Sequence, residues 1–306
     1  MFIAIEWTSM TFHAFLLSND GSLRGERQEA RGINHIGGGA FEKTLRDIVG
    51  DWTTKASRIY LSGMITSRNG WVETPYAQAP ASLDDVAAQA VIKLMDGLPS
   101  LVFLPGVSVR DPLPDMMRGE ELKIFGAMGL NSGLVVLPGA HSKWVSVKKG
   151  RIEHFATYMS GEIATLLKSN SLVSKLIPEQ SIDSQEAFLR GVRLAQDRCI
   201  GGHVLRRIFS ARSGALCGEL SPAEISDYLS GLLIGAEVRE AIAEFSAPDN
   251  HVTLIGAPAL CRRYGLALQE AGMRSSVTDN AALRAFQALC VSSPCFSGTV
   301  ESASRN

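Results

Sequence analysis

The stretch Leu134–Val147, LVVLPGAHSKWVSV, holds the pattern on which the fold prediction rests. Its first four residues form a short apolar run with β-branched members, which predicts a strand covered on both faces. Pro138 and Gly139 end that strand, and Gly139 allows the backbone to come close to a ligand. From Trp144 an apolar pattern resumes. The stretch therefore predicts two strands joined by a glycine turn.

The turn between these strands carries small, polar and cationic groups. Ala140, His141 and Ser142 follow the glycine, and Lys143 comes next. Backbone amides that point outward beside a lysine can bind a phosphate or a carboxylate. An ordinary β-turn with a solvated lysine explains the same residues, and the spacing alone does not decide between the two interpretations.

The start of the chain repeats this design. Phe2–Glu6 predicts a short apolar strand that ends on a carboxylate, and Thr8, Ser9 and Met10 predict a polar turn. A second strand follows, and Asn19–Gly21 is a strong hairpin signal before a third. Two copies of one unit, half a chain apart, predict two related domains that bind a ligand between their turns.

Composition narrows the class of protein. The chain has 306 residues, of which 45% are hydrophobic and 20% charged, and its net charge is −1. These values fit a soluble globular protein with two cores, and they give no basic surface for nucleic acid. We see no signal peptide, and no apolar run reaches the roughly 18 residues of a membrane span, so we expect a cytoplasmic protein without membrane contact. The five cysteines form no CxxC pair, so we expect reduced thiols.

A helix is expected over 117–128, and its first turn holds charged residues. Arg118, Glu120 and Glu121 lie there. Acidic groups in a first turn favour the helix dipole, which is a purely structural explanation. Two adjacent carboxylates beside an arginine also suit a metal site or a general base.

Other candidate ligand-binding residues come just after expected strands or just after the starts of expected helices. Trp71 offers a stacking surface in a polar loop, and Glu162 lies just after Ser160, a natural N-cap. Gly256 separates a strand from a helix, an order that is common at nucleotide sites but weak as a motif. In the helix expected from Ser221 to about Phe245, Gly231 and Gly235 lie one turn apart, which indicates a closely packed helix or a nucleotide.

Together these stretches resemble the 2-dehydro-3-deoxygalactonokinase family. The matching motifs, in the family's order, are SGM at Ser62–Met64, NGW at Asn69–Trp71, RGEE at Arg118–Glu121, LPGAHSKWV at Leu137–Val145, MSGE at Met159–Glu162 and LSGLLIGAEV at Leu229–Val238. The resemblance implies an α/β fold of the actin-like ATPase superfamily, with two ribonuclease-H-like domains and ATP in the cleft between them. We expect these domains at residues 1–116 and 117–291, and a flexible tail at 292–306.

The resemblance also implies an activity. The family uses ATP and Mg²⁺ to phosphorylate the 6-hydroxyl of 2-dehydro-3-deoxy-D-galactonate, a step of galactonate catabolism. The alternative is a catalytically weakened protein of the same fold that senses a sugar acid or a nucleotide. The sequence leaves the oligomeric state open, with a homodimer as one option.

A cleft that takes a sugar acid and ATP needs cations and backbone amides, and one carboxylate must orient or deprotonate the attacking hydroxyl. The residues expected to be catalytic are Glu120, Glu121 and Arg118. Those expected at ATP, its phosphates and the metal are Glu6, Thr8, Ser9, Gly139, Ala140, His141 and Gly256, with Glu6 toward the metal. Those expected at the sugar acid are Lys143, Trp71 and Glu162.

The first loop departs from the family's pattern of Asp-Trp-Gly, small hydroxyl residues and a later arginine. Glu6 is longer than the aspartate by one methylene, and Thr8 adds a side chain in place of the glycine. Met10 lacks a hydroxyl, and His13 replaces the expected cation. In the second loop Ala140 stands where a hydroxyl residue is often found. We expect these changes to weaken binding of MgATP, unless neighbouring side chains have compensated for them.

Overall fold

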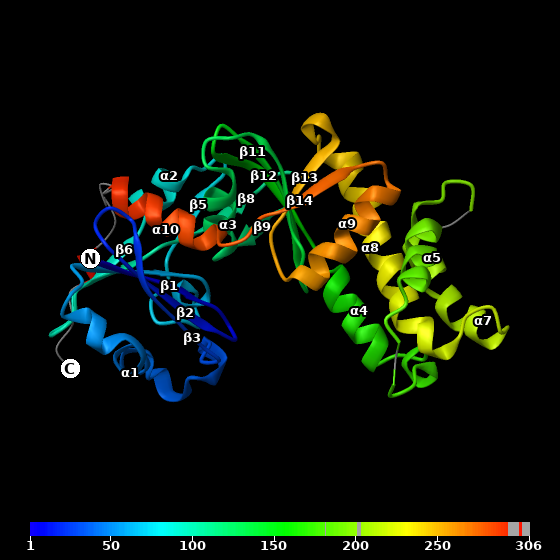
Figure 1. Ribbon diagram of the computed structural model, residues 1–306, viewed down its shortest axis with the longest axis horizontal. Coiled ribbons are helices and arrows are strands. Elements are labelled where there is room, and N and C mark those ends of the chain that lie inside the picture. The colour runs from blue at the N-terminus through cyan, green and yellow to red at the C-terminus, as the bar shows by residue number, and fades with distance from the viewer. Residues whose placement is uncertain (181, 201–202, 293–299, 302–306) are drawn as a thin grey trace. The chain divides into compact units, whose positions relative to one another are not determined.

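The computed structural model describes residues 1–180, 182–200, 203–292 and 300–301 (Figure 1). The chain forms two compact units. Unit 1 consists of Met1–Ser132, Val147–His154 and Asp279–Asn306, and unit 2 consists of Gly133–Ser146 and Phe155–Thr278. The division into two ribonuclease-H-like domains at residue 116 stays a prediction. Most of the tail expected at 292–306 lies outside the described residues.

Unit 1 is built on a seven-stranded sheet (Figure 1). In pairing order its strands are β15 (Val300–Glu301), β6 (Val91–Lys93), β7 (Ser100–Phe103), β4 (Arg58–Ser62), β1 (Phe2–Trp7), β2 (Phe12–Leu17) and β3 (Leu23–Glu29). β1 is antiparallel to β2 and parallel to β4. Alternate residues of β1 pack with the apolar face of α1 (Phe41–Thr53), which explains why that strand is buried.

Unit 1 also contains a smaller sheet and further helices. A second, three-stranded sheet contains β5 (Tyr76–Gln78), β8 (Gly106–Val109) and β9 (Asp115–Met117). The remaining helices are α2 (Leu83–Ala88), α3 (Glu120–Met128) and α10 (Ala281–Ser292), and α10 packs against α3. The helix expected from residue 117 begins later, at Glu120, because Met117 is still paired with Val107 in the small sheet.

Unit 2 contains a five-stranded sheet that repeats the strand order of unit 1. Its order is β12 (Arg151–Tyr158), β11 (Ser142–Lys148), β10 (Gly133–Leu137), β13 (His251–Leu254) and β14 (Arg274–Val277). This is the succession β3, β2, β1, β4, β7 of the first sheet, and β10 is parallel to β13 as β1 is to β4. The duplication predicted from the two strand–turn–strand units is therefore confirmed in strand order.

The helices of unit 2 follow β12 or β13 in the sequence, and most of them lie to one side of the sheet (Figure 1). They are α4 (Ser160–Ser169), α5 (Gln185–Gln196), α6 (Val204–Ile208), α7 (Ser210–Leu216), α8 (Ile225–Glu244) and α9 (Pro258–Glu270). Short 3₁₀ turns in the two units lie at Ile33–His35, Gly37–Gly39, Met64–Thr66, Ser174–Leu176, Pro222–Glu224 and Pro248–Asn250.

The residues before α8 cap its N-terminus, and a glycine within it allows close packing against another helix. At the start of the helix expected from Ser221, Ser221 and Glu224 form a capping box, with Pro222 between them. A Cβ on Gly231 would lie 1.9 Å from the carbonyl oxygen of Phe188 in α5. The glycine therefore allows two helices to cross closely, and the helix-packing interpretation of Gly231 is confirmed.

Two findings within the described residues bear on membrane spans and on the cysteines. No helix there is both long and apolar enough to cross a membrane. Among the cysteines that the structure describes, Cys199, Cys217, Cys261 and Cys290 are free thiols. The fifth, Cys295, lies outside the described residues.

Candidate active site

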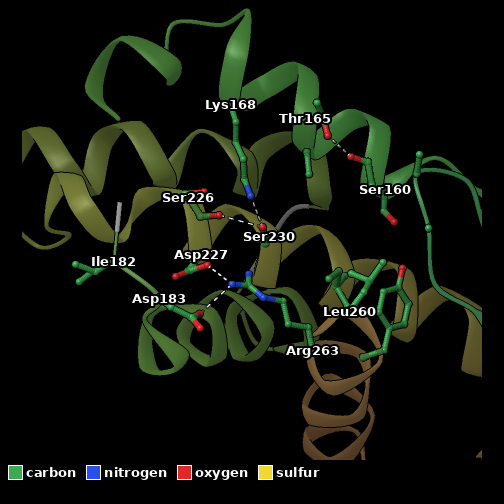
Figure 2. A pocket seen from close by; sticks show the side chains of 16 residues that line it. Ser160, Thr165, Lys168, Ile182, Asp183, Ser226, Asp227, Ser230, Leu260 and Arg263 are labelled. Carbon is green, nitrogen blue, oxygen red and sulfur yellow. Dashed lines mark hydrogen bonds and ion pairs between the residues drawn. The ribbon is translucent and has the colours of Figure 1, made fainter. Parts of the chain in front are cut away.

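A pocket of about 590 Å³ opens in unit 2 beside the predicted glycine turn (Figure 2). Gly139 and Ala140 of the turn line it, together with the first residues of α4. Its apolar wall consists of Ile182, Ile234 and Leu260. A pocket of this size and mixed lining suits a small molecule that has one flat apolar part and one charged part.

The N-terminus of α4 sits directly against the turn. A Cβ on Gly161 would lie 2.3 Å from the carbonyl oxygen of Gly139, so only glycine permits this approach. The backbone N–H of Glu162 donates to the carbonyl oxygen of Ala140 at 3.0 Å. The free amides of a helix start and the positive end of its dipole favour an anion at this place.

The structure also brings together two side chains that we expected at different substrates, one at ATP and one at the sugar acid. Nε2 of His141 lies 2.5 Å from Oε2 of Glu162. Both side chains are substantially exposed, 52% and 40%, so the pair is open to solvent. His141, predicted at the phosphates, and Glu162, predicted at the sugar acid, thus flank the same turn.

Behind the turn lies a buried carboxylate that sequence reasoning missed. Glu237 of α8 is 3% exposed and accepts hydrogen bonds from four side chains of three other elements. The donors are Ser142 Oγ at 2.8 Å, Trp144 Nε1 at 2.8 Å, Tyr264 OH at 2.8 Å and Ser160 Oγ. Burial raises the pKa of Glu237, and the four donors oppose that rise by stabilising the carboxylate.

Charged groups from α4, α8, α9 and the segment before α5 also line the unit 2 pocket (Figure 2). Arg263 pairs with Asp227 at 2.6 Å and with Asp183 at 3.2 Å. Lys168 Nζ donates to Ser230 Oγ at 2.5 Å, and its pKa is lowered by burial and by the nearby Arg263. Sequence reasoning missed all of these, because they come from four segments with no shared motif.

Unit 1 has its own pocket, of about 350 Å³, at the ends of β1 and β4. The structure gathers there five of the residues predicted from sequence: Glu6, Thr8, Ser9, Arg118 and Glu120. Lys123, which the sequence did not single out, also lines it. The first loop and the start of α3 therefore form one site, although more than a hundred residues separate them in the sequence.

The guanidinium of Arg118 is occupied by the loop that follows β4. Its Nη1 donates to the carbonyl oxygen of Thr66 at 2.6 Å and to Thr74 Oγ1 at 2.5 Å. Its plane lies over the ring of Tyr76, 4.2 Å from the centroid. Through these contacts Arg118 holds the loop after β4 in place at the wall of the pocket. A direct role of Arg118 in catalysis stays a prediction.

The two adjacent carboxylates of α3 have different environments. Glu121 is fully buried, and both of its oxygens accept from the N–H of Gly119, at 2.7 and 3.0 Å. Burial, with a smaller contribution from Glu120, raises the pKa of Glu121 to about 8. Glu120 lines the pocket and accepts from the N–H of Arg118 at 2.9 Å. Glu120 is thus the carboxylate that a substrate can reach.

Glu6 at the end of β1 forms an ion pair with Lys123 of α3. Burial lowers the pKa of Lys123, but the carboxylates of Glu6, Glu120 and Glu121 together outweigh burial and leave that pKa raised. Within the described residues no group of three or more His, Cys, Asp or Glu could hold a metal by itself. Mg²⁺ commonly takes one or two carboxylates together with phosphate oxygens and water, so Glu6 fits an ion that arrives with ATP.

Three further predicted residues lie outside both pockets' linings. Lys143 of β11 is 6% exposed, so it is not the solvated surface group of the alternative interpretation. Trp71 packs against Phe41 and Phe103 in the core of unit 1. Gly256 follows β13, and a Cβ there would lie 3.4 Å from the carbonyl oxygen of Pro138. Their contacts with substrates stay predictions.

Comparison with known proteins points to one group of kinases. A family described as 2-keto-3-deoxy-galactonokinase matches residues 6–289. The 2-dehydro-3-deoxygalactonokinase of Escherichia coli (strain K12) is 33% identical over 289 residues, which cover 94% of this chain and 95% of that protein. A crystal structure from Sinorhizobium meliloti, of a protein assigned as a 2-dehydro-3-deoxygalactonokinase, is 29% identical, with a TM-score of 0.85 over 96% of this chain and 99% of that one.

A more distant structure bears on the fold alone. A protein of Porphyromonas gingivalis assigned as an N-acetylglucosamine kinase is 13% identical and has a TM-score of 0.50, over 95% of this chain and 99% of that one. Together with the repeated strand order, this likeness confirms the predicted fold class, an α/β fold of the actin-like sugar kinase type.

Proposed function

We propose that this chain, which belongs to the 2-keto-3-deoxy-galactonokinase family, transfers the γ-phosphoryl group of ATP to the 6-hydroxyl of 2-dehydro-3-deoxy-D-galactonate. The observation that carries the proposal is the family match over residues 6–289. Membership confirms the resemblance drawn from six short motifs. Nothing in the comparisons favours the alternative of a non-catalytic sensor.

In this proposal the nucleotide binds in the pocket of unit 2. The apolar wall that includes Ile234 and Leu260 supports packing of the adenine base, and the carboxylates of Asp183 and Asp227 suit the ribose hydroxyls. The glycine turn at Gly139 and the amides at the start of α4 suit the phosphates, because both present N–H groups to an anion.

The pocket of unit 1 supplies the chemistry on the acceptor. Glu120 takes the proton of the 6-hydroxyl as its oxygen bonds to the γ-phosphorus and the bond from that phosphorus to the β-phosphate oxygen breaks, which releases ADP. Mg²⁺ bound with ATP would neutralise phosphate charge, and Glu6, which lines the same pocket, is the carboxylate that we assign to it. Glu121 is sealed from substrate and positions the start of α3.

The sugar acid brings a carboxylate that needs a cation. Lys143 is the residue we assign to it, with Trp71 and Glu162 as further contacts. A buried ammonium suits this part because a charge-assisted hydrogen bond is stronger where water is excluded. The cytoplasm and galactonate catabolism are the setting that such a substrate implies.

Identification of the product tests the proposal. Incubation with ATP, Mg²⁺ and 2-dehydro-3-deoxy-D-galactonate should give a phosphomonoester whose phosphorus NMR signal couples to the two protons on carbon 6. The variant Glu120→Gln, which keeps the shape of the side chain but cannot accept the proton, is the control and should give almost none. A phosphate at another carbon, or ADP without a phosphorylated sugar, would contradict it.

A further inference from the structure

Glu6 and His13 face each other across the first two strands of unit 1. They are directly paired in the register of β1 and β2. Side chains of such a pair project from the same face of a sheet, so a long cation at position 13 would reach the carboxylate at position 6. The resemblance noted from the sequence implies an arginine near this position, and this chain has a histidine instead.

His13 does not replace that arginine, because its ring is engaged elsewhere. Its Nε2 lies 2.7 Å from Oε1 of Glu26 on β3, and its ring packs 4.2 Å from that of Phe15. The carboxylate of Glu6 therefore needs another cation.

Lys123 is that cation. Its ammonium, on α3, contacts Oε1 of Glu6. The side chain of Glu6 is 12% exposed and that of Lys123 is 34% exposed, so the lysine still opens toward the pocket that both line. An ammonium has three N–H donors, and one bond to Glu6 leaves two for a ligand.

The position of Lys123 on its helix matters as much as its charge. It lies three residues after Glu120, and residues at this spacing are neighbours on one face of a helix. Both line the unit 1 pocket. The helix thus presents a proton acceptor and a cation to the same space.

We propose, on the basis of the function proposed above, that Lys123 contacts the transferred γ-phosphoryl group of ATP and takes over the charge that an arginine at position 13 would supply. This arrangement accounts for two departures noted in the sequence. Glu6 pairs with the cation on α3, and His13 pairs with Glu26. The loop is rearranged rather than impaired, which is the compensated alternative left open by the sequence.

Binding of ATP relative to ADP tests this directly, because only ATP carries the γ-phosphate. Isothermal titration calorimetry with a non-hydrolysable ATP analogue and with ADP gives the ratio of their dissociation constants. Lys123→Met keeps the length of the side chain and removes the charge. We expect it to shift that ratio against the ATP analogue by about tenfold, as loss of one charge-assisted contact implies.

A second variant keeps the proposal falsifiable if Lys123→Met does not fold. The double change His13→Arg with Lys123→Gln moves the cation back across the strands and should keep the ratio within about threefold of wild type, whereas Lys123→Gln alone should not. Lys43→Met, at an exposed lysine of unit 1 that pairs with Asp47, is the control and should change nothing.

Two results would overturn the proposal. One is an unchanged ratio in folded Lys123→Met or Lys123→Gln. The other is failure of His13→Arg to restore the ratio in the folded double variant. If the wild-type protein bound ATP but phosphorylated no sugar acid, the proposed function would fail while the ratio still tested Lys123.

Discussion

The indole Nε1 of Trp144 donates a 2.8 Å hydrogen bond to Oε1 of Glu237, which joins strand β11 to helix α8. Ser160 at the start of α4 and Tyr264 of α9 donate to the other oxygen of the same carboxylate. These elements surround the glycine turn at Gly139. The buried Glu237 therefore holds in place the turn to which we assign the phosphates.

Glu237→Ala should destabilise the protein strongly, because it leaves several buried donors without an acceptor. Each such donor costs about 1–3 kcal/mol, so we expect a loss of at least about 3 kcal/mol in the free energy of unfolding, measured in urea. Trp144→Phe removes one donor and keeps an aromatic ring, and it should cost clearly less. A loss below about 0.5 kcal/mol in Glu237→Ala would show that this network does not support the turn.

Substitutions of the two carboxylates of α3 should have different effects on kcat. Glu120→Gln should lower kcat by at least about a hundredfold and leave the melting temperature nearly unchanged, because Glu120 faces the pocket. Glu121→Gln should lower kcat much less, because Glu121 is fully buried and contacts the backbone of Gly119. Steady-state rates beside thermal unfolding decide it, and the reverse order of effects would make Glu121 the base.

Glu121 should also make stability depend on pH. Its pKa is raised from the ordinary 4.5 to about 8, mainly by burial, so between these values the folded chain binds more protons than the unfolded chain. The free energy of unfolding should therefore fall as the pH rises from 4.5 to 8. Glu121→Gln has no proton to lose, so its curve should fall less than that of wild type. Urea unfolding at pH 6 and pH 8 tests this, and parallel curves would contradict it.

Lys143→Ala should lower phosphorylation of the sugar acid by at least about tenfold, because a charge-assisted contact in a closed site contributes roughly 1.5–3 kcal/mol. Its effect should fall on kcat/KM for the sugar acid more than on KM for ATP. Lys148→Ala, at an exposed lysine of the same strand, is the matched control. Wild-type kinetics in folded Lys143→Ala would remove Lys143 from the site.

The fold could be predicted largely because its signals are local. Each of these signals depends only on residues that are neighbours in the sequence. Examples are the apolar run at Leu134–Leu137, the hairpin signal at Asn19–Gly21 and the helix start at Ser221. The start of α3 was missed because Met117 pairs with Val107 in the small sheet, and that contact is tertiary. A local pattern of acidic residues cannot reveal it.

Residues of the candidate site could be predicted mainly where they lie within one of the short motifs that carry the resemblance. Residues 118–120 line the unit 1 pocket and the glycine turn at 139–140 lines the unit 2 pocket, as a resemblance could suggest. Glu237 and Lys123 were missed because each derives its meaning from a partner far along the chain. For Glu237 one signal was present, a carboxylate within an otherwise apolar stretch of helix, and such a group is buried only with partners.

The rate of ADP release in a coupled assay over a panel of 2-keto-3-deoxy sugar acids tests the proposed kinase activity most directly. We expect ADP to form only when ATP, Mg²⁺ and a sugar acid are all present, and kcat/KM to be highest for 2-dehydro-3-deoxy-D-galactonate. ADP release that no sugar acid accelerates, from protein that binds ATP, would contradict it.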